Sequence, residues 1–252
     1  MKKQKSVFEV YAHEYDLITN AAQREAYHTR EVKSIIERFK PQKVLDAGCA
    51  TGLTALLFAR QGVETVGLDR SRSMIKQAQE TRSDTNLSLD FQYGSFERLP
   101  KRMYRQFDLV VCLANSISGV ANLSDLRKVM INFRAILRSG GHLVLQMLNY
   151  SAITADTLMT IKATENDGIV YERFSERKGR SLFVYVSRAD FNQTPPKFEV
   201  FRHQFDNYTP EQMLRCIKDA GFVKSKKFAN LYLDKRFSRK GRDLVITAMA
   251  AD

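Results

Sequence analysis

The stretch "VLDAGCATGLTALLFARQGVETVGLDRS", residues 44–71, joins a glycine-containing turn to two aspartates. "VLDAG" predicts a short buried strand, "LTALLFARQ" a helix that ends before Gly62, and "VETVGLD" a second strand. A strand, a helix and a second strand in this order form a crossover unit, which is typical of a parallel sheet. The stretch therefore predicts an α/β fold.

The alternation of strands and helices continues along most of the chain. We expect further strands at 87–93, 107–114 and 142–149, and helices at 71–82, capped by Ser71 or Ser73, and at 123–139, ended by Gly140 and Gly141. Right-handed crossovers between these elements predict a Rossmann-like doubly wound sheet. A helix at 209–222 and two strands at 223–233 and 241–250 complete seven strands, mostly parallel with a closing antiparallel hairpin.

Two segments differ from this core. Residues 6–40 are expected to be helical, with helical spacing clearest over 24–40, and Pro41 should end the helix and push Lys40 into an extended conformation. Between 151 and 205, apolar and polar residues alternate with period two, which predicts two or three antiparallel strands. We therefore expect an N-terminal helical lid (1–40), a ligand-binding core (41–150), an inserted antiparallel β cover (151–205), and a last helix with the closing strands of the core sheet (206–252).

Composition limits the class of protein. The 252 residues carry a net charge of +12, which favours an anionic partner such as a phosphorylated metabolite, RNA or a membrane surface. The basic patches at 2–5, 173–180 and 224–242 lack the aromatic interleaving that RNA-binding segments show. No apolar run is long enough to span a membrane, and the N-terminus has no apolar signal region, so we expect a cytoplasmic protein. The spacing of its three cysteines and four histidines predicts neither disulfides nor a metal site.

The glycine turn does not follow the dinucleotide pattern G-x-G-x-x-G. Its glycines are Gly48 and Gly52, with Ala50 between them, and Asp46 precedes the turn. A carboxylate beside a pyrophosphate is electrostatically unfavourable, whereas it suits a cationic ligand such as the sulfonium and ammonium of S-adenosylmethionine. Asp69 ends the second strand, where a carboxylate can accept hydrogen bonds from both hydroxyls of a ribose.

These residues resemble motif one and the following acidic motif of class I S-adenosylmethionine-dependent methyltransferases, which read D-x-G-x-G-x-G and then an acid at the end of strand two. "FDLVVCLANSISGV" (107–120) and "LRSGGHLVLQMLNY" (137–150) are similar to the fourth-strand and fifth-strand motifs of that family. The chain is most similar to the glycine N-methyltransferase-like branch, although Ala114 replaces a glycine of its fourth-strand motif. The resemblance extends from about residue 11 to the end of the fifth strand.

The resemblance implies a set of cofactor-binding residues. The backbone of the turn would line the methionine part of the cofactor, Asp69 would hold the ribose, and the residues after Asp69 would flank the adenine. An arginine of the first long helix would meet the cofactor carboxylate, and a tyrosine of the lid would cover the site. Ser95 stands where the family usually has an acid that meets the adenine amino group, so that contact is missing here. The implied residues are Tyr15, Arg24, Asp46, Gly48, Cys49, Ala50, Gly52, Asp69, Arg70, Met74, Ser95, Phe96, Leu113 and Asn115.

The resemblance also implies the reaction. S-adenosylmethionine supplies a reactive methyl group and leaves as S-adenosylhomocysteine, so the protein mainly aligns the reactants and removes water. Asn115 and Tyr150, each at the end of a strand, are the candidate catalytic residues. His203, on the inserted strands, could face the substrate, but a surface position is favoured. We expect N- or O-methylation of a small-molecule acceptor, and the charge favours an anionic one. The alternatives are an RNA or protein methyltransferase that uses the basic surface, and a non-catalytic module that binds S-adenosylmethionine.

Overall fold

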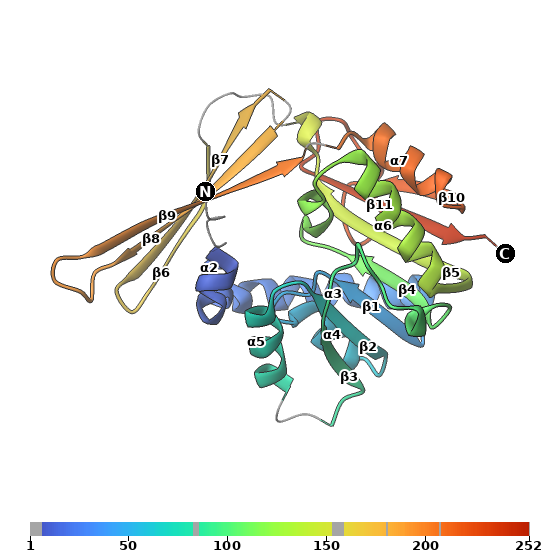
Figure 1. The fold of residues 1–252 in the computed structure, drawn as a ribbon, viewed down its shortest axis with the longest axis horizontal. Helices are drawn as coiled ribbons and strands as arrows, with labels where there is room; N and C mark the ends of the chain where they lie inside the picture. The colour runs from blue at the N-terminus through green and yellow to red at the C-terminus, as the bar shows by residue number, and fades with distance from the viewer. Residues whose placement is uncertain (1–6, 83–85, 153–158, 180, 207, 252) are drawn as a thin grey trace.

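The computed structural model describes residues 7–82, 86–152, 159–179, 181–206 and 208–251. It contains a seven-stranded sheet, the core sheet, and a separate four-stranded sheet (Figure 1). The order of strands in the core sheet is β10-β11-β5-β4-β1-β2-β3. Their bounds are β1 Lys43–Ala47, β2 Glu64–Asp69, β3 Leu89–Tyr93, β4 Phe107–Cys112, β5 Leu137–Leu148, β10 Phe222–Phe228 and β11 Asp243–Ala250.

The core sheet reverses its direction of winding between β1 and β4. β1 pairs in parallel with β2 on one side and with β4 on the other, and the chain then continues outward to β3 and to β5. β11 is antiparallel to both β5 and β10, which confirms the closing hairpin. In an open α/β sheet, ligands bind at the carboxyl ends of the strands where the order reverses. The end of β1 is therefore the expected site.

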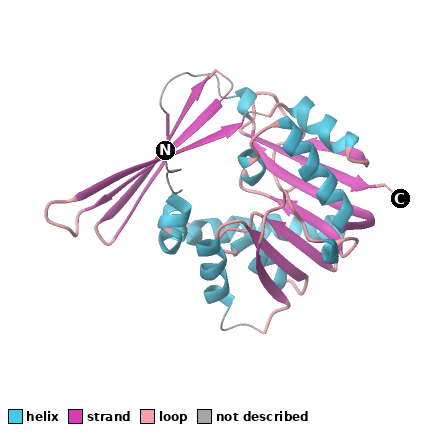
Figure 2. Ribbon diagram, viewed as in Figure 1, coloured by secondary structure: helices cyan, strands magenta, loops and turns pink. Residues whose placement is uncertain are grey.

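Helices cover both faces of the core sheet (Figure 2), because its strands carry apolar side chains on both faces. α6 and α7 pack on one face through Leu45, Val110 and Leu143 of the sheet. α3 and α4 pack on the other face, where α5 follows beside α4. The helices are α1 Val7–Val10, η1 Ala12–Glu14, α2 Tyr15–Thr19, α3 Ala21–Phe39, α4 Leu53–Arg60, α5 Arg72–Arg82, η2 Lys101–Met103, η3 Ser116–Gly119, α6 Leu123–Ile136, η4 Tyr150–Ala152 and α7 Pro210–Asp219.

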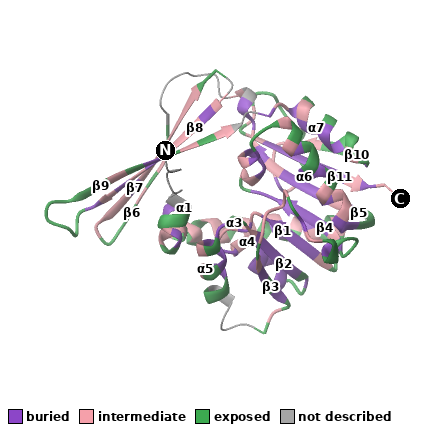
Figure 3. Ribbon diagram, viewed as in Figure 1, coloured by how far each residue is buried: buried purple, intermediate pink, exposed green. Residues whose placement is uncertain are grey.

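The four-stranded sheet, which we call the cover, lies beside the N-terminal helices. Its antiparallel strands follow the chain in order: β6 Met159–Asn166, β7 Ile169–Lys178, β8 Ser181–Asp190 and β9 Lys197–Asp206. Along β9 the residues alternate between exposed and buried or half-buried, so the cover has one solvent face and one inner face. Figure 3 shows the buried residues gathered in the core sheet and exposed residues at the far end of the cover.

Three local predictions were wrong. Helix α6 ends at Ile136, and residues from Leu137 onward already belong to β5, because Leu137 is buried and pairs with Phe107 of β4. Gly140 does not end the helix. It lies within β5, near the point where the register between β4 and β5 shifts, and its φ is +71°. Lys40 is not extended: its φ is +47°, and its N–H caps the helix by donating to the carbonyl of Ile36 at 2.7 Å.

The remaining local predictions have mixed outcomes. The cover contains four strands rather than two or three. Ser71 caps α5 by accepting the N–H of Met74, and Thr209 begins α7 with a capping box. The basic patch at 2–5 and the part of the predicted cover at 153–158 lie outside the described residues. The four predicted domain boundaries stay predictions.

Candidate active site

The turn after β1 is tightly packed, and its glycines have structural reasons to be glycine. The N–H groups of Gly48 and Cys49 both donate to the carbonyl of Leu68, at 2.7 and 3.1 Å. Gly48 has a φ of +85°, and a Cβ on it would lie 2.7 Å from Cβ of Ser116 in η3. Gly52 also has a φ of +85°, and a Cβ there would lie 2.5 Å from the ring of Phe91. The turn thereby brings the end of β1 against η3 and β3.

Two carboxylates meet at this turn. Asp46 is 2% exposed, and its Oδ2 has no hydrogen-bond partner among the described residues. Burial, and next the charge of Asp69, raise the pKa of Asp46 to about 7. Asp69 accepts the N–H of Ala50 at 3.0 Å and that of Ser71 at 2.8 Å, and burial raises its pKa against these donors. The turn therefore holds two carboxyl groups away from water, and the ionisation of Asp46 is unfavourable without a cation beside it.

This donor set fits the cofactor that the sequence predicts. A buried, unpartnered carboxylate oxygen beside a second carboxylate is costly by itself and is stabilised when a cation binds. Each oxygen of Asp69 accepts one backbone N–H and has a second lone pair for a hydroxyl. A sulfonium or ammonium group with a ribose meets both requirements, whereas a pyrophosphate meets neither.

The N-terminal helices lie over this turn. The hydroxyl of Thr51 donates to Asp16 of α2 at 2.8 Å, which joins the lid to the turn. The guanidinium of Arg24 lies 5.8 Å from the centre of the Tyr15 ring, and Nε of Arg24 is buried with no partner among the described atoms. Burial raises the pKa of Tyr15, and Asp69 adds to this effect, so Tyr15 lies within electrostatic range of that carboxylate. The structure thus brings Tyr15 and Arg24 together with the two aspartates.

The residues predicted around the adenine have defined partners. Met74 is buried in the first turn of α5, and Nη2 of Arg70 lies 3.8 Å from the position of a Cβ on Gly119 in η3. The hydroxyl of Ser95 accepts the N–H of Glu97 at 3.1 Å, so it caps a turn. The Phe96 ring packs 5.8 Å from that of Phe133 of α6 and reaches back toward the glycine turn.

Two further predicted cofactor residues have their side chains in the apolar core. Leu113 belongs to the cluster beneath α3 and α4, together with Val32 and Ile35. Cys49 packs between α4 and α5, and burial raises the pKa of its thiol well above the ordinary range. Side-chain contact between Leu113 and the cofactor therefore has no support in its packing, whereas the predicted role of Cys49 requires only its backbone.

Asn115 and Tyr150 follow the neighbouring strands β4 and β5, so they lie close together. Their side chains hydrogen-bond to each other. Nδ2 of Asn115 donates to the Tyr150 hydroxyl at 2.8 Å, and its Oδ1 accepts the N–H of Leu148 at 3.0 Å and the hydroxyl of Ser118 at 2.9 Å. Tyr150 is 2% exposed. The pair ties the end of β4 to the end of β5, so it positions the site, and its direct contact with an acceptor stays a prediction.

An ionic cluster that joins the lid to the cover escaped the sequence analysis. Arg188 of β8 donates to both carboxylate oxygens of Glu14, at 2.9 and 3.0 Å, and to Asp190 at 3.3 Å. The hydroxyl of Tyr171 on β7 also contacts Glu14, and these partners raise the pKa of Arg188 while lowering that of Glu14 despite its burial. No sequence pattern could pair these residues, because Glu14 and Arg188 are 174 positions apart.

His203 was expected at the surface, and this expectation was wrong. It is half-buried on the inner face of the cover, opposite Val184 of β8. Burial, and next the positive charge of Arg70, lower its pKa. β9 also packs against η3, the element that follows the end of β4. The period of two along "FRHQF" places His203 on the same face as buried Phe201, a signal that was present in the sequence.

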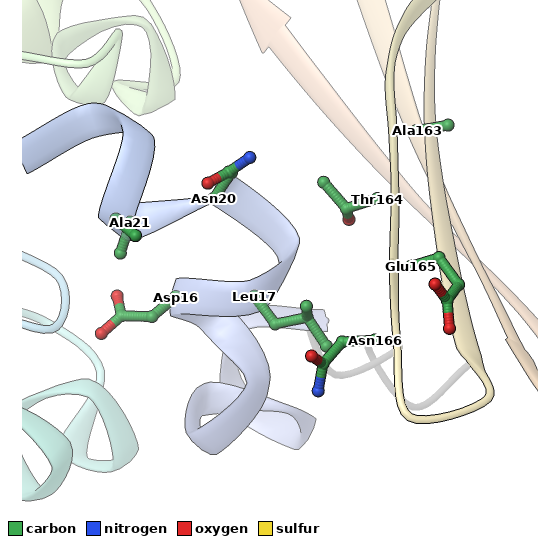
Figure 4. A pocket seen from close by; sticks show the side chains of 9 residues that line it. Asp16, Leu17, Asn20, Ala21, Ala163, Thr164, Glu165 and Asn166 are labelled. Atoms are coloured by element: carbon green, nitrogen blue, oxygen red, sulfur yellow. The ribbon is translucent and has the colours of Figure 1, made fainter.

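A groove of about 430 Å³ lies apart from this site. It lies between the lid and β6, where Leu17 points toward Asn166 of that strand and Asp16 points away from it (Figure 4). None of the predicted cofactor residues lines it. Among the described residues, no group of three His, Cys, Asp or Glu side chains is placed to hold a metal ion. No helix in the same residues is long and apolar enough to cross a membrane.

Comparisons with known proteins agree with this geometry. Residues 44–141 match the family described as "Methyltransferase domain". The glycine/sarcosine N-methyltransferase of Aphanothece halophytica is 24% identical over 150 residues, which cover 60% of this chain and 57% of that protein. Matches to the first four curated relatives span 31% to 57% of their lengths, so the chain covers about half of a typical relative.

Solved structures show the same fold. An S-adenosylmethionine-dependent methyltransferase from Clostridium acetobutylicum superposes with a TM-score of 0.78 at 16% identity, covering 97% of this chain and 99% of that one. CalS10, an amino pentose methyltransferase from Micromonospora echinaspora solved with bound S-adenosylmethionine, has a TM-score of 0.71 at 18% identity, covering 93% and 97%. Residues 44–141 are therefore similar to the methyltransferase domain family, and the chain has the fold of the class I S-adenosylmethionine-dependent methyltransferases.

Proposed function

We propose that the protein transfers a methyl group from S-adenosylmethionine to the nitrogen or oxygen of a small-molecule acceptor. One observation carries the proposal: a buried oxygen of Asp46, which has no hydrogen-bond partner among the described residues, lies beside Asp69 at the point where the sheet order reverses, beneath Tyr15 and Arg24 of the lid. The family match supports it, and so do relatives that are named for methylating glycine, sarcosine and an amino pentose. The three free, buried cysteines fit a reducing cytoplasmic setting.

The residues divide into a cofactor side and an acceptor side. When bound, the cofactor supplies the reactive methyl group and its leaving group. Asp46 would stabilise the cationic part of the ligand and Asp69 its ribose hydroxyls, while Arg24 would meet the cofactor carboxylate. Tyr15 and the cover exclude water from the strand ends. Burial lowers the pKa of His203 and so favours its neutral form, which would accept the proton that an amine or hydroxyl acceptor loses.

Calorimetry tests the cofactor half of the proposal. Asp69→Ala should weaken S-adenosylmethionine binding by about 1–3 kcal/mol, because charge-assisted hydrogen bonds to the ribose are lost. Asp90→Ala, on the exposed face of the neighbouring β3, is the control and should bind like the wild type. Unchanged affinity in folded Asp69→Ala would remove the ribose assignment.

Transfer of a labelled methyl group tests the acceptor half. Small amines and hydroxy compounds should be methylated, and the rate should not depend on added RNA. Turnover that requires RNA or a protein acceptor, and that falls steeply with salt, would assign the chain to a macromolecular class instead. Tight cofactor binding with no turnover of any acceptor class would contradict catalysis.

A further inference from the structure

The inner face of the cover spans from the lid to the core sheet. The antiparallel register places Tyr171, Arg188 and Glu199 side by side in a row that contacts the lid. At the other end, Leu182 and Phe205 form a row that packs into the core cluster beneath α6 and α7. Two rows lie between these ends: Arg173, Val186 and Phe201, whose apolar members also pack against Ile18 of the lid, and then Ser175, Val184 and His203. The row that contains Arg173 therefore lies at the junction of the cover and the lid.

Arg173 is the charged residue of these middle rows. It lies two positions from Tyr171 on β7, so both side chains are on the face that meets the lid. Its Nε is buried with no hydrogen-bond partner among the described atoms. A buried guanidinium nitrogen without an acceptor is costly, and the structure offers it none.

A second cation stands directly opposite Arg173. Lys162 of β6 is its partner in the antiparallel register, and like charges in facing positions destabilise a sheet. The Lys162 ammonium reaches Gln23 of α3 at 3.2 Å, which places it at the junction of cover and lid. Within the described part of the chain, neither Lys162 nor Arg173 has a carboxylate in an ion pair. Two cations thus face each other, and no carboxylate of the described residues pairs with either of them.

Other cations lie near this pair. Burial has the largest effect and lowers the pKa of Arg173; Arg24 and Arg242 lower it further, while Tyr15 and Tyr27 oppose the shift. Burial, then Arg173 and Arg24, lower the pKa of Lys162 in the same way. Each positive charge therefore makes the charged form of the others less favourable. An anion bound among them would offset both the cost of burying these cations and their mutual repulsion.

We infer that Arg173 and Lys162 form a subsite for an anionic group, a carboxylate or a phosphate, on the methyl acceptor. The inference rests on the proposed function, because it assigns Arg24 to the cofactor carboxylate and leaves Arg173 and Lys162 for the acceptor. The planar fork of arginine binds both kinds of oxyanion through two parallel hydrogen bonds, and the lysine adds a point charge. The subsite lies on the chain's inserted cover, and so it would select the acceptor without changing the cofactor site.

The test uses the full chain saturated with S-adenosylhomocysteine, so that the cofactor carboxylate occupies its own site. Inorganic phosphate and acetate are titrated separately by calorimetry into the wild type, Arg173→Gln, Arg173→Lys and Lys162→Gln. The matched control is Arg202→Gln, which removes an exposed arginine from the outer face of β9 in the same cover. Melting temperatures verify that each variant is folded.

We expect the wild type and Arg202→Gln to bind one of the two anions, and Arg173→Gln to bind it at least tenfold more weakly. Arg173→Lys should be intermediate, and the affinity for S-adenosylhomocysteine should stay the same in all variants. The anion that binds identifies the group as carboxylate or phosphate. A wild type that binds S-adenosylhomocysteine but neither anion overturns the subsite alone, whereas one that does not bind S-adenosylhomocysteine overturns the proposed function. Arg24→Gln, at the residue assigned to the cofactor carboxylate, is measured for comparison. If Arg173→Gln binds S-adenosylhomocysteine as weakly as Arg24→Gln does, Arg173 belongs to the cofactor site instead.

Discussion

Asp46→Asn should make the ligand-free protein more stable at neutral and alkaline pH, although it removes a predicted cofactor-binding residue. Burial, and next Asp69, raise the pKa of Asp46 from its ordinary 3.8 to about 7. At 1.36 kcal/mol for each pKa unit, ionising this carboxyl costs the folded state about 4 kcal/mol. Asparagine has nearly the shape of the neutral acid, keeps an oxygen for the N–H of Ala55, and avoids that cost.

The sign of the pH dependence follows from proton binding. The folded-state pKa lies above the unfolded value, so between about pH 4 and pH 7 the folded chain holds more protons than the unfolded chain. The contribution of Asp46 to the free energy of unfolding therefore falls as pH rises through this window, and it levels off above pH 7. Asparagine does not titrate, so the free energies of unfolding of the two proteins should agree near pH 4 and differ by about 4 kcal/mol at pH 8.

Urea unfolding from pH 4 to pH 8.5 at constant ionic strength, monitored by circular dichroism, measures this difference. Glu37→Gln, at an exposed position of α3, is the control for loss of one negative charge and should change stability by less than about 0.5 kcal/mol. Added S-adenosylmethionine should stabilise the wild type at pH 8 more than Asp46→Asn, because only the wild type offers it the buried negative charge. A variant that is less stable than the wild type at pH 8, or a difference that does not change with pH, would refute the reasoning.

Two further predictions concern the lid and the strand ends. Glu14→Gln should lower the free energy of unfolding by about 3 kcal/mol, because it leaves Arg188 buried with a weaker partner; a loss below 1 kcal/mol in urea unfolding would mean that the cluster does not hold the lid. Ala114→Gly should raise stability by about 0.5–1 kcal/mol, because Ala114 has a φ of +51° that glycine adopts without strain. Ala22→Gly, at an exposed position of α3, should change stability in the opposite direction, and equal effects would contradict the explanation for Ala114.

The sequence predicted the core sheet because its signals are local. The turn from Asp46 to Gly52, the acid at Asp69 and the cap at Ser71 each depend on residues within a few positions of one another. Such signals determine strand ends and helix starts, and strand order then follows from crossover handedness. The prediction for α6 was wrong at its end because Leu137 has a buried place in β5 that no helical pattern reveals.

The predicted partnership of Asn115 and Tyr150 shows where strand-end reasoning is incomplete. Both residues lie at the expected edge of the sheet, and that much follows from the parallel arrangement of β4 and β5. The groups that they bind depend on their rotamers and on a φ of +69° at Asn115, and the local sequence pattern predicts neither. Position at a strand end predicts proximity to the site, but it does not distinguish a side chain that contacts the acceptor from one that holds the strands together.

The two halves of the candidate site differ in how they are encoded. The two aspartates of the cofactor half, Asp46 and Asp69, come from one continuous stretch, so a sequence pattern identifies them. The acceptor half requires that the cover reach the lid, and this depends on Arg188 meeting Glu14 across most of the chain length. Arg173 and His203 lie on an inner face only once that contact has formed, because the inner face of a strand is the one that packs against another element. If the cover binds the acceptor as we propose, a change in the cover should alter the acceptor while the motif at β1 and its cofactor stay the same.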